Sequence, residues 1–254
     1  MTDQRAMAFV NLYGVLAALE NLCALDAQAK SVLQRLKQPV SLCFEVKNGP
    51  CGTLHFDRDG CIFTEGSQGC TCKMSFSSPA AFNNLIDHSK PGIPTKNPVQ
   101  VLSFLLGPFT ALTNRLNEVL RPSEAAMKDR SFFELSTALT FYTIAVGISA
   151  LANTDPISRI SASNTCDGDI SLGIAEAASV TISVRDHHFT TIKTACSKPK
   201  AKMEFADLDL AHSLFTGTAS TINELCKGRI RLAGMISMVD NVNRILDRIA
   251  VYLA

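Results

Sequence analysis

The chain has 254 residues, which allows one large domain or two domains of about 125 residues each. An apolar fraction of 46% supplies enough hydrophobic side chains for well-packed cores. The 24 basic and 23 acidic residues leave a net charge of +1. This balance argues against a nucleic-acid surface, which needs a dense basic patch.

The N-terminal stretch 6–26 is apolar enough to suggest a signal peptide, but its pattern is that of a helix. Its apolar side chains recur at spacings of three and four: Phe9, Leu12, Leu16, Leu19 and Cys23. We therefore expect an amphipathic helix over 5–24 rather than a targeting segment. The apolar run 141–152 is shorter than the about 20 residues that a membrane span needs, so we expect no stable membrane insertion.

In the first half of the chain, alternating and helical patterns predict strands between helices. The expected strands lie around 42–46, 54–56, 61–65 and 70–76, and a helix follows over about 79–88. Residues 89–98 carry three prolines and predict a loop. The segment 99–106 is a strand candidate with a helix as the alternative, and a helix that ends at Pro122 follows it.

The second half repeats this order after a polar linker over 122–130. A helix is expected over 131–152, with a further helical turn after Asp155-Pro156. Alternating residues predict strands around 170–174, 180–184, 189–193, 200–205 and 228–232. Helices are expected over 208–216 and over the apolar stripe from Met235 to Ile249.

Several identical residues recur at an offset of 129 positions. The matching pairs are Lys73 and Lys202, Met74 and Met203, Phe76 and Phe205, and Leu85 and Leu214. A steady order of elements at one offset predicts an internal duplication. We expect two domains, 1–122 and 131–254, that pack as a pseudo-dimer, and a homo-oligomer is compatible with this arrangement.

The predicted order of helices and strands resembles the sterol carrier protein type 2 family. The closest match runs from Lys202 to Ile245 and includes the strand Gly228–Leu232, which leads directly into a methionine-rich helix. The resemblance implies an α+β fold with two copies of a five-stranded antiparallel sheet covered by helices, and a lipid site between sheet and helices. The first copy departs from the pattern, because Val101-Leu102-Ser103-Phe104 replaces the basic–apolar alternation of Arg229–Leu232.

The apolar helices either fill cores or line a cavity. Methionine suits a cavity wall because its unbranched, polarisable side chain adapts to variable acyl chains, and a lipid site otherwise needs only an apolar concavity with few polar groups. The candidate ligand-binding residues are Leu210, Leu214, Phe215, Leu232, Met235, Met238, Val239 and Val242, with Phe82, Leu85, Phe109, Leu112 and Leu116 in the other copy. Arg229 and Arg231 either bind a carboxylate or phosphate head group or simply lie on an exposed strand face.

Residues that often carry catalysis or bind metals form no complete motif. The nine cysteines are scattered and odd in number, which favours free thiols in a reducing, cytoplasmic compartment over a disulfide framework. Cys70-Thr71-Cys72 lacks the second pair that a zinc site needs, and His187-His188 lies in a predicted turn. There is no Walker loop, Gly-x-Gly-x-x-Gly or His-Glu-x-x-His sequence. We expect neither a metal nor a cofactor.

The sequence therefore favours a non-enzymatic carrier of a fatty acid, acyl-CoA, isoprenoid or sterol-like lipid. Two alternatives stay open. One is an interaction or sensing module whose cores are filled, and the other is a thiol-dependent redox protein or enzyme centred on Cys70 and Cys72.

Overall fold

The structure is a computed structural model that describes residues 2–87 and 98–253, with the backbone alone for 98–100. The chain forms two compact units, Met1–Leu135 and Ser136–Ala254. The boundary lies inside the long helix α7 (Arg130–Thr154). Each unit is described by itself below.

The first unit begins with a helix that has a π-helical middle, followed by a shorter helix. Its segments are α1 (Gln4–Phe9), η1 (Val10–Leu16), α2 (Ala18–Leu25) and α3 (Ala27–Gln34). Asp3 caps the first segment by accepting a hydrogen bond from the Ala6 N–H at 2.8 Å. Asp26 has an extended backbone and caps α3 in the same way, through the Ala29 N–H. The helix expected over 5–24 is thus confirmed, and it ends where the capping aspartate begins the next helix.

The sheet of the first unit has four strands in the order β3-β2-β1-β4. They are β1 (Val40–Val46), β2 (Cys51–Phe56), β3 (Cys61–Glu65) and β4 (Cys72–Phe76). The turn between β1 and β2 contains Asn48 with φ of 60°, a left-handed conformation that asparagine tolerates better than most residues. The helix α4 (Pro79–Asp87) follows β4, and the predicted loop over 89–98 lies almost wholly outside the described residues.

The strand candidate at 99–106 is a helix in the structure. The segments are α5 (Pro98–Phe104), η2 (Leu105–Phe109) and α6 (Thr110–Leu120). Val101, Phe104 and Leu105 are buried, whereas Leu102 and Leu106 are exposed. Burial at spacings of three and four is a helical pattern, and it explains why this segment adds no fifth strand to the first sheet.

The second unit has the five-stranded sheet that was expected, in the order β7-β6-β5-β8-β9. Its strands are β5 (Gly168–Ile174), β6 (Ala178–Arg185), β7 (His188–Ile192), β8 (Ala201–Phe205) and β9 (Ile230–Gly234). Its helices after α7 are α8 (Ser158–Ser163), α9 (Leu208–Phe215), α10 (Thr221–Cys226) and α11 (Ile236–Leu253). The turn between β6 and β7 places Asp186 and His187 at positive φ, as a tight hairpin requires.

Both sheets are mixed, so the expectation of purely antiparallel sheets is wrong. β4 runs parallel to β1, and β8 runs parallel to β5, whereas the other paired strands are antiparallel. The third strand of each unit is followed by a connection that returns the chain to the start of its first strand. An alternating sequence pattern does not show whether neighbouring strands run parallel or antiparallel, because alternation depends only on which face of the sheet a side chain occupies.

The two units share their strand pairing. Leu42 lies beside Cys72 and Phe44 beside Met74 in the first sheet. In the second sheet the corresponding neighbours are Ile170 with Ala201 and Leu172 with Met203. The hydroxyls of Thr53 and Thr181 also make the same bond, each donating at 2.7 Å to a carbonyl oxygen thirteen residues later in the chain.

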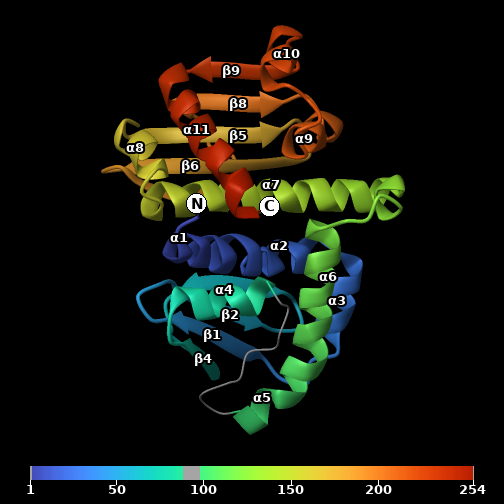
Figure 1. The fold of residues 1–254 in the computed structure, drawn as a ribbon. Coiled ribbons are helices and arrows are strands. Elements are labelled where there is room, and N and C mark those ends of the chain that lie inside the picture. The colour runs from blue at the N-terminus through green and yellow to red at the C-terminus, as the bar shows by residue number, and fades with distance from the viewer. Residues whose placement is uncertain (1, 88–97, 254) are drawn as a thin grey trace. The chain divides into compact units, whose positions relative to one another are not determined.

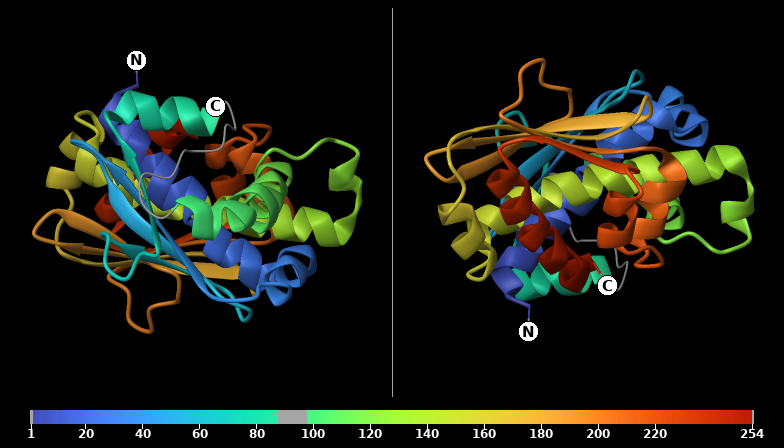
Figure 2. Two further views of the ribbon diagram at one scale, coloured as in Figure 1. Left: turned by 90° about the horizontal axis from the view of Figure 1, so that it is seen from below. Right: turned by 90° about the horizontal axis from the view of Figure 1, so that it is seen from above.

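Helices cover one face of each sheet. In the first unit, α4 and α6 lie on the same side of the strands; in the second, α11 crosses the sheet and α7 lies on that side (Figures 1 and 2). The covered face of β5 carries the buried residues Ile170, Leu172 and Ile174. Alternate residues such as Ser171 point to the opposite face. The core of each unit therefore lies between one sheet face and its helices.

Two helical stretches are long and apolar enough to cross a membrane by length and composition, Gln4–Leu25 and Arg130–Thr154. The second is longer than the twelve-residue run on which the sequence argument was based. Within their most apolar windows, 61% and 67% of the residues are buried. Core helices of soluble proteins pass the same test, so this finding is weak evidence for a membrane protein.

Candidate functional site: an apolar cavity in the second unit

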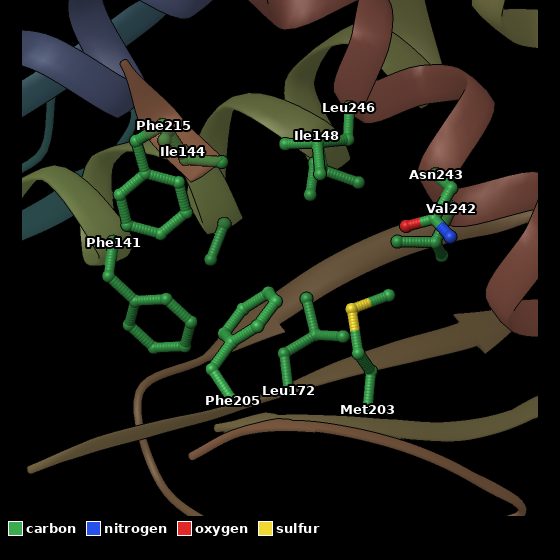
Figure 3. Close-up of a pocket in the computed structure, with 11 residues that line it drawn as sticks. Phe141, Ile144, Ile148, Leu172, Met203, Phe205, Phe215, Val242, Asn243 and Leu246 are labelled. Carbon is green, nitrogen blue, oxygen red and sulfur yellow. The ribbon is translucent and has the colours of Figure 1, made fainter. Parts of the chain in front are cut away.

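A small cavity lies between the sheet and the helices of the second unit (Figure 3). Its floor is made by Leu172 of β5 and by Met203 and Phe205 of β8, which point from the strands towards the helices. Leu172 and Met203 are parallel-strand neighbours, so the sheet register itself brings them together. All three side chains are buried.

Three helices supply the walls and the mouth. The walls come from buried residues, namely Phe141, Ala145 and Ile148 of α7 and Val242 of α11. The half-buried residues at the solvent side are Ile144, Phe215, Asn243 and Leu246. Phe215 extends from α9 and packs edge-on against Phe205, with 6.2 Å between the ring centres. Asn243 is the only lining residue with a polar side chain, so the site offers one amide at its mouth and hydrocarbon elsewhere.

The cavity has a volume of about 20 Å³. That is room for about one water molecule, whereas pockets that enclose a small ligand measure about 300–1,000 Å³. A lipid chain would therefore have to displace lining side chains. The half-buried residues at the mouth are the ones that solvent already reaches, so they can move at the lowest cost in lost packing.

The predicted site residues of the second unit do not all meet at this cavity. Phe215 and Val242 line it. Leu210, Met238 and Val239 are buried but lie outside the lining, and Leu214 and Leu232 are half-buried outside it. Met235 is 39% exposed, and the Cys166 thiol donates a hydrogen bond to its sulfur.

In the first unit, phenylalanine rings fill the corresponding space. Phe44 stands at the position of Leu172, since both lie beside a methionine of the parallel strand. Its ring is 6.4 Å from that of Phe82 and 6.3 Å from that of Phe109. The connected rings, here called the phenylalanine cluster, are Phe44, Phe56, Phe76, Phe82, Phe104 and Phe109.

The other predicted residues of the first unit lie on the helices α4 and α6. Leu112 and Leu116 of α6 are buried, and Leu85 of α4 is half-buried. Aromatic rings carry large apolar areas, so six of them occupy much of the volume between a four-stranded sheet and its helices. In the first unit, aromatic rings therefore occupy the region that corresponds to the cavity of the second unit.

The Arg229 side chain binds acidic residues of the same unit and does not line the cavity. Its guanidinium donates to both carboxylate oxygens of Asp207 at 3.2 Å and to Glu224 at 3.1 Å. Asp207 in turn caps α9 by accepting a bond from the Leu210 N–H. Arg229 thus holds the start of α9 against α10, which positions Phe215 at the cavity mouth.

The cysteine and histidine candidates lie apart from the cavity. Cys72 is buried on the core face of the first sheet, where burial first and the neighbouring Cys70 second raise the pKa of its thiol. A raised pKa lowers the fraction of reactive thiolate. His187 and His188 are exposed around the β6–β7 turn. No group of three or more potential metal ligands occurs among the residues that the structure describes.

Sequence reasoning recognised the strands and helices of the cavity but did not name most of its lining. The lining residues of α7 lie at positions 141, 144, 145 and 148, a spacing of three and four that marks one helix face. That signal was present in the sequence. It could not show which of several apolar faces borders empty space, because a void depends on how side chains from different elements fill one another's gaps.

No protein-family model and no curated protein matches this sequence. Several solved structures do match this chain. A crystal structure of sterol carrier protein 2 is 15% identical with a TM-score of 0.33, covering 43% of this chain and 92% of that one. Sterol carrier protein 2 like 2 from Aedes aegypti is 14% identical with a TM-score of 0.28, covering 39% and 90%.

A third match is a Thermus thermophilus protein described as possibly a sterol carrier protein. It is 16% identical with a TM-score of 0.30, and the match covers 40% of this chain and 78% of that chain. Each of these three matches covers less than half of the present chain. Identities and TM-scores this low do not assign the chain to a family.

Proposed function

We propose that this protein binds a hydrophobic small molecule, such as a fatty acid, acyl-CoA, isoprenoid or sterol-like lipid, in the apolar space between the sheet and the helices of its second unit. The observation that carries the proposal is the cavity itself, which is lined by hydrocarbon and bordered by half-buried residues. The resemblance of Lys202–Ile245 to the sterol carrier protein type 2 pattern supports the same assignment. In this proposal the protein carries its ligand in the cytoplasm and catalyses no reaction.

Ligand entry in this proposal widens the cavity at its mouth. Phe215 belongs to the eight-residue helix α9, and Leu246 lies on the solvent side of α11. Moving these two side chains costs less buried area than moving the fully buried lining residues, because both are only half-buried. The Asn243 amide can then hydrogen-bond a polar head group, while the chain of the ligand contacts Leu172 and Met203.

The test is a titration of the purified chain with a fluorescent fatty acid, combined with native mass spectrometry for lipids that co-purify. Leu246→Asp places a charge at the mouth, and we expect it to weaken binding about tenfold or more, which corresponds to about 1.4 kcal/mol. Ile160→Asp is the matched control, because Ile160 is 65% exposed on α8 and lies outside the lining. Absence of both bound lipid and fatty-acid binding would reject the proposal.

A second candidate function is an interaction or sensing module with filled cores. The small volume of the cavity and the phenylalanine cluster of the first unit favour it. In that case neither unit takes up a lipid, and Phe215→Ala, which widens the mouth, creates no binding either. Under the carrier proposal the same variant binds the fluorescent fatty acid more tightly than the natural chain.

We further propose that the two units arose by duplication. The shared strand pairing and the matching bonds of Thr53 and Thr181 support this origin. The helix at 98–104 in place of a fifth strand would then be a later divergence of the first unit.

A further inference from the structure

The face of the first sheet opposite Leu42 and Phe44 carries a group of thiols. Cys43 of β1 lies directly opposite Thr53 of β2, and Glu45 lies opposite Cys51. Cys43 and Cys51 are therefore diagonal neighbours on one face of an antiparallel pair. The right-handed twist of paired strands brings one diagonal closer than the other.

The two thiols are close enough for Cys51 to affect the pKa of Cys43. Besides the larger effect of burial, the Thr53 side chain lowers the pKa of the Cys43 thiol, and the neighbouring Cys51 raises it. Cys43 is fully buried, whereas Cys51 is half-buried and within reach of a small reagent. Lys73 is the neighbour of Cys43 on β4, and its ammonium group interacts electrostatically with both thiols. Lys73 is also paired with Glu45 at 2.7 Å.

The second unit has serines at the corresponding positions. Ser171 lies opposite Thr181, as Cys43 lies opposite Thr53, and Ser179 takes the place of Cys51. The backbone at these positions accepts a small polar side chain in either unit. Neither strand pairing nor packing of this face therefore requires sulfur, and the thiol pair distinguishes the first unit.

We propose that Cys43 and Cys51 are a redox-responsive pair that forms a reversible disulfide by exchange with a low-molecular-weight disulfide. The Cys51 thiolate attacks one sulfur of the reagent, forms a mixed disulfide and releases one reagent thiol. The Cys43 sulfur then attacks Cys51, loses its proton to solvent and displaces the second reagent thiol. Both cysteines are oxidised, and one reagent disulfide is reduced to two thiols.

The burial of Cys43 gives the second step a kinetic signature. Burial is the largest cause that raises the pKa of this thiol to about 12, and the nearby Cys51 and Cys70 add to it, whereas Thr53 opposes it. The charged groups near Cys43 on this face are Lys73 and Glu45, which pair with each other. The titratable His55 lies on the same face, where its ring nitrogens bond Ser41 and Thr64. Since only the thiolate attacks, closure of the ring accelerates as pH rises, and the mixed disulfide at Cys51 accumulates at neutral pH.

The experiment treats the native full-length chain with oxidised glutathione at increasing pH, blocks the remaining thiols by alkylation and maps tryptic peptides. Lys47 lies between the two cysteines, so the disulfide joins peptides 38–47 and 48–58. We expect this linked pair, with one hydrogen lost from each thiol, and its reversal by dithiothreitol. Cys51→Ser abolishes the link, whereas the matched control Cys70→Ser retains it.

Three results would overturn the proposal. One is a glutathione adduct at Cys51 that never closes at any pH, which would show that the thiols cannot reach bonding geometry. Another is a link from either cysteine to Cys70 in place of the pair. The third is a Cys43–Cys51 link that forms only after the chain is denatured, because the native sheet would then play no part in bringing the thiols together.

Discussion

Asp26 and Asp155 occupy the same place in the two units, 129 positions apart, and perform the same task. Each follows the first long helix of its unit, is buried, and accepts a hydrogen bond from the N–H three residues later. An arginine of the last helix binds each carboxylate. Arg115 of α6 makes two bonds to Asp26, at 2.9 and 3.2 Å, and Arg248 of α11 lies 3.5 Å from Asp155.

The Asp155 carboxylate should make the second unit sensitive to acid. Burial alone would raise its pKa, but hydrogen bonds from Tyr252, Ser158 and Arg248 outweigh burial and hold the pKa below its ordinary value of 3.8. A lowered pKa in the folded state means that this contribution to stability is complete above the ordinary value. It is lost as the pH falls through the folded-state pKa.

Tyr252→Phe tests this arrangement, because the Tyr252 hydroxyl donates to Asp155 at 2.7 Å. Removing a bond to a buried charged group should lower the free energy of unfolding by about 1.5–3 kcal/mol. It should also raise the pKa of Asp155, so that acid destabilisation begins at higher pH than in the natural chain. Urea unfolding between about pH 3 and pH 7 measures both effects. Tyr142→Phe is the control, and an equal loss in both variants would contradict the prediction.

Exchanging one residue between the units should move the ligand-binding capacity. Phe44→Leu gives the first unit the residue that stands at Leu172, opens the phenylalanine cluster and costs about 1–2 kcal/mol of stability. Leu172→Phe fills the floor of the second cavity. If the carrier proposal holds, we expect the number of fatty acids bound per chain to rise in the first variant and to fall in the second.

Isothermal titration with a fatty acid measures that number, and thermal unfolding shows whether each variant remains folded. Unchanged stoichiometry in a folded Leu172→Phe variant would remove the cavity from the binding site.

Gly234 should tolerate no side chain, although it lies at the end of an exposed edge strand. Its φ is +75°, and an added Cβ would collide with the carbonyl oxygen of Lys200, which is backbone and cannot swing away. Gly217 has a similar φ of +70° but faces open space. Gly217→Ala should therefore cost only the left-handed strain of about 1–2 kcal/mol.

We expect Gly234→Ala to cost clearly more than Gly217→Ala and to weaken the pairing of β9 with β8. Urea unfolding gives the difference in stability, and hydrogen exchange of the β9 amides reports the pairing. Similar losses in the two variants would show that the contact with Lys200 relaxes.

The local elements were largely predictable. The alternating runs, the capped helices and the turn at Asp186-His187 are set by each residue's own conformational preferences and by which side chains avoid water. The segment 98–104 was not decided in advance, because its short apolar run fits both a strand and a helix. Its helical form depends on burying Val101, Phe104 and Leu105 together, which requires the rest of the unit.

The sequence by itself determined the order of helices and strands, the repeated pattern at an offset of 129 and the apolar faces that build the two cores. Only the tertiary structure decided that β4 and β8 run parallel to their neighbours, that Cys43 and Cys51 are diagonal neighbours on one sheet face, and that the second unit has a cavity where phenylalanines pack in the first. The physical reason is the separation along the chain over which each effect acts. Periodicity and capping act between residues a few positions apart, whereas strand direction, diagonal contacts and voids arise between segments that meet only after the chain has folded.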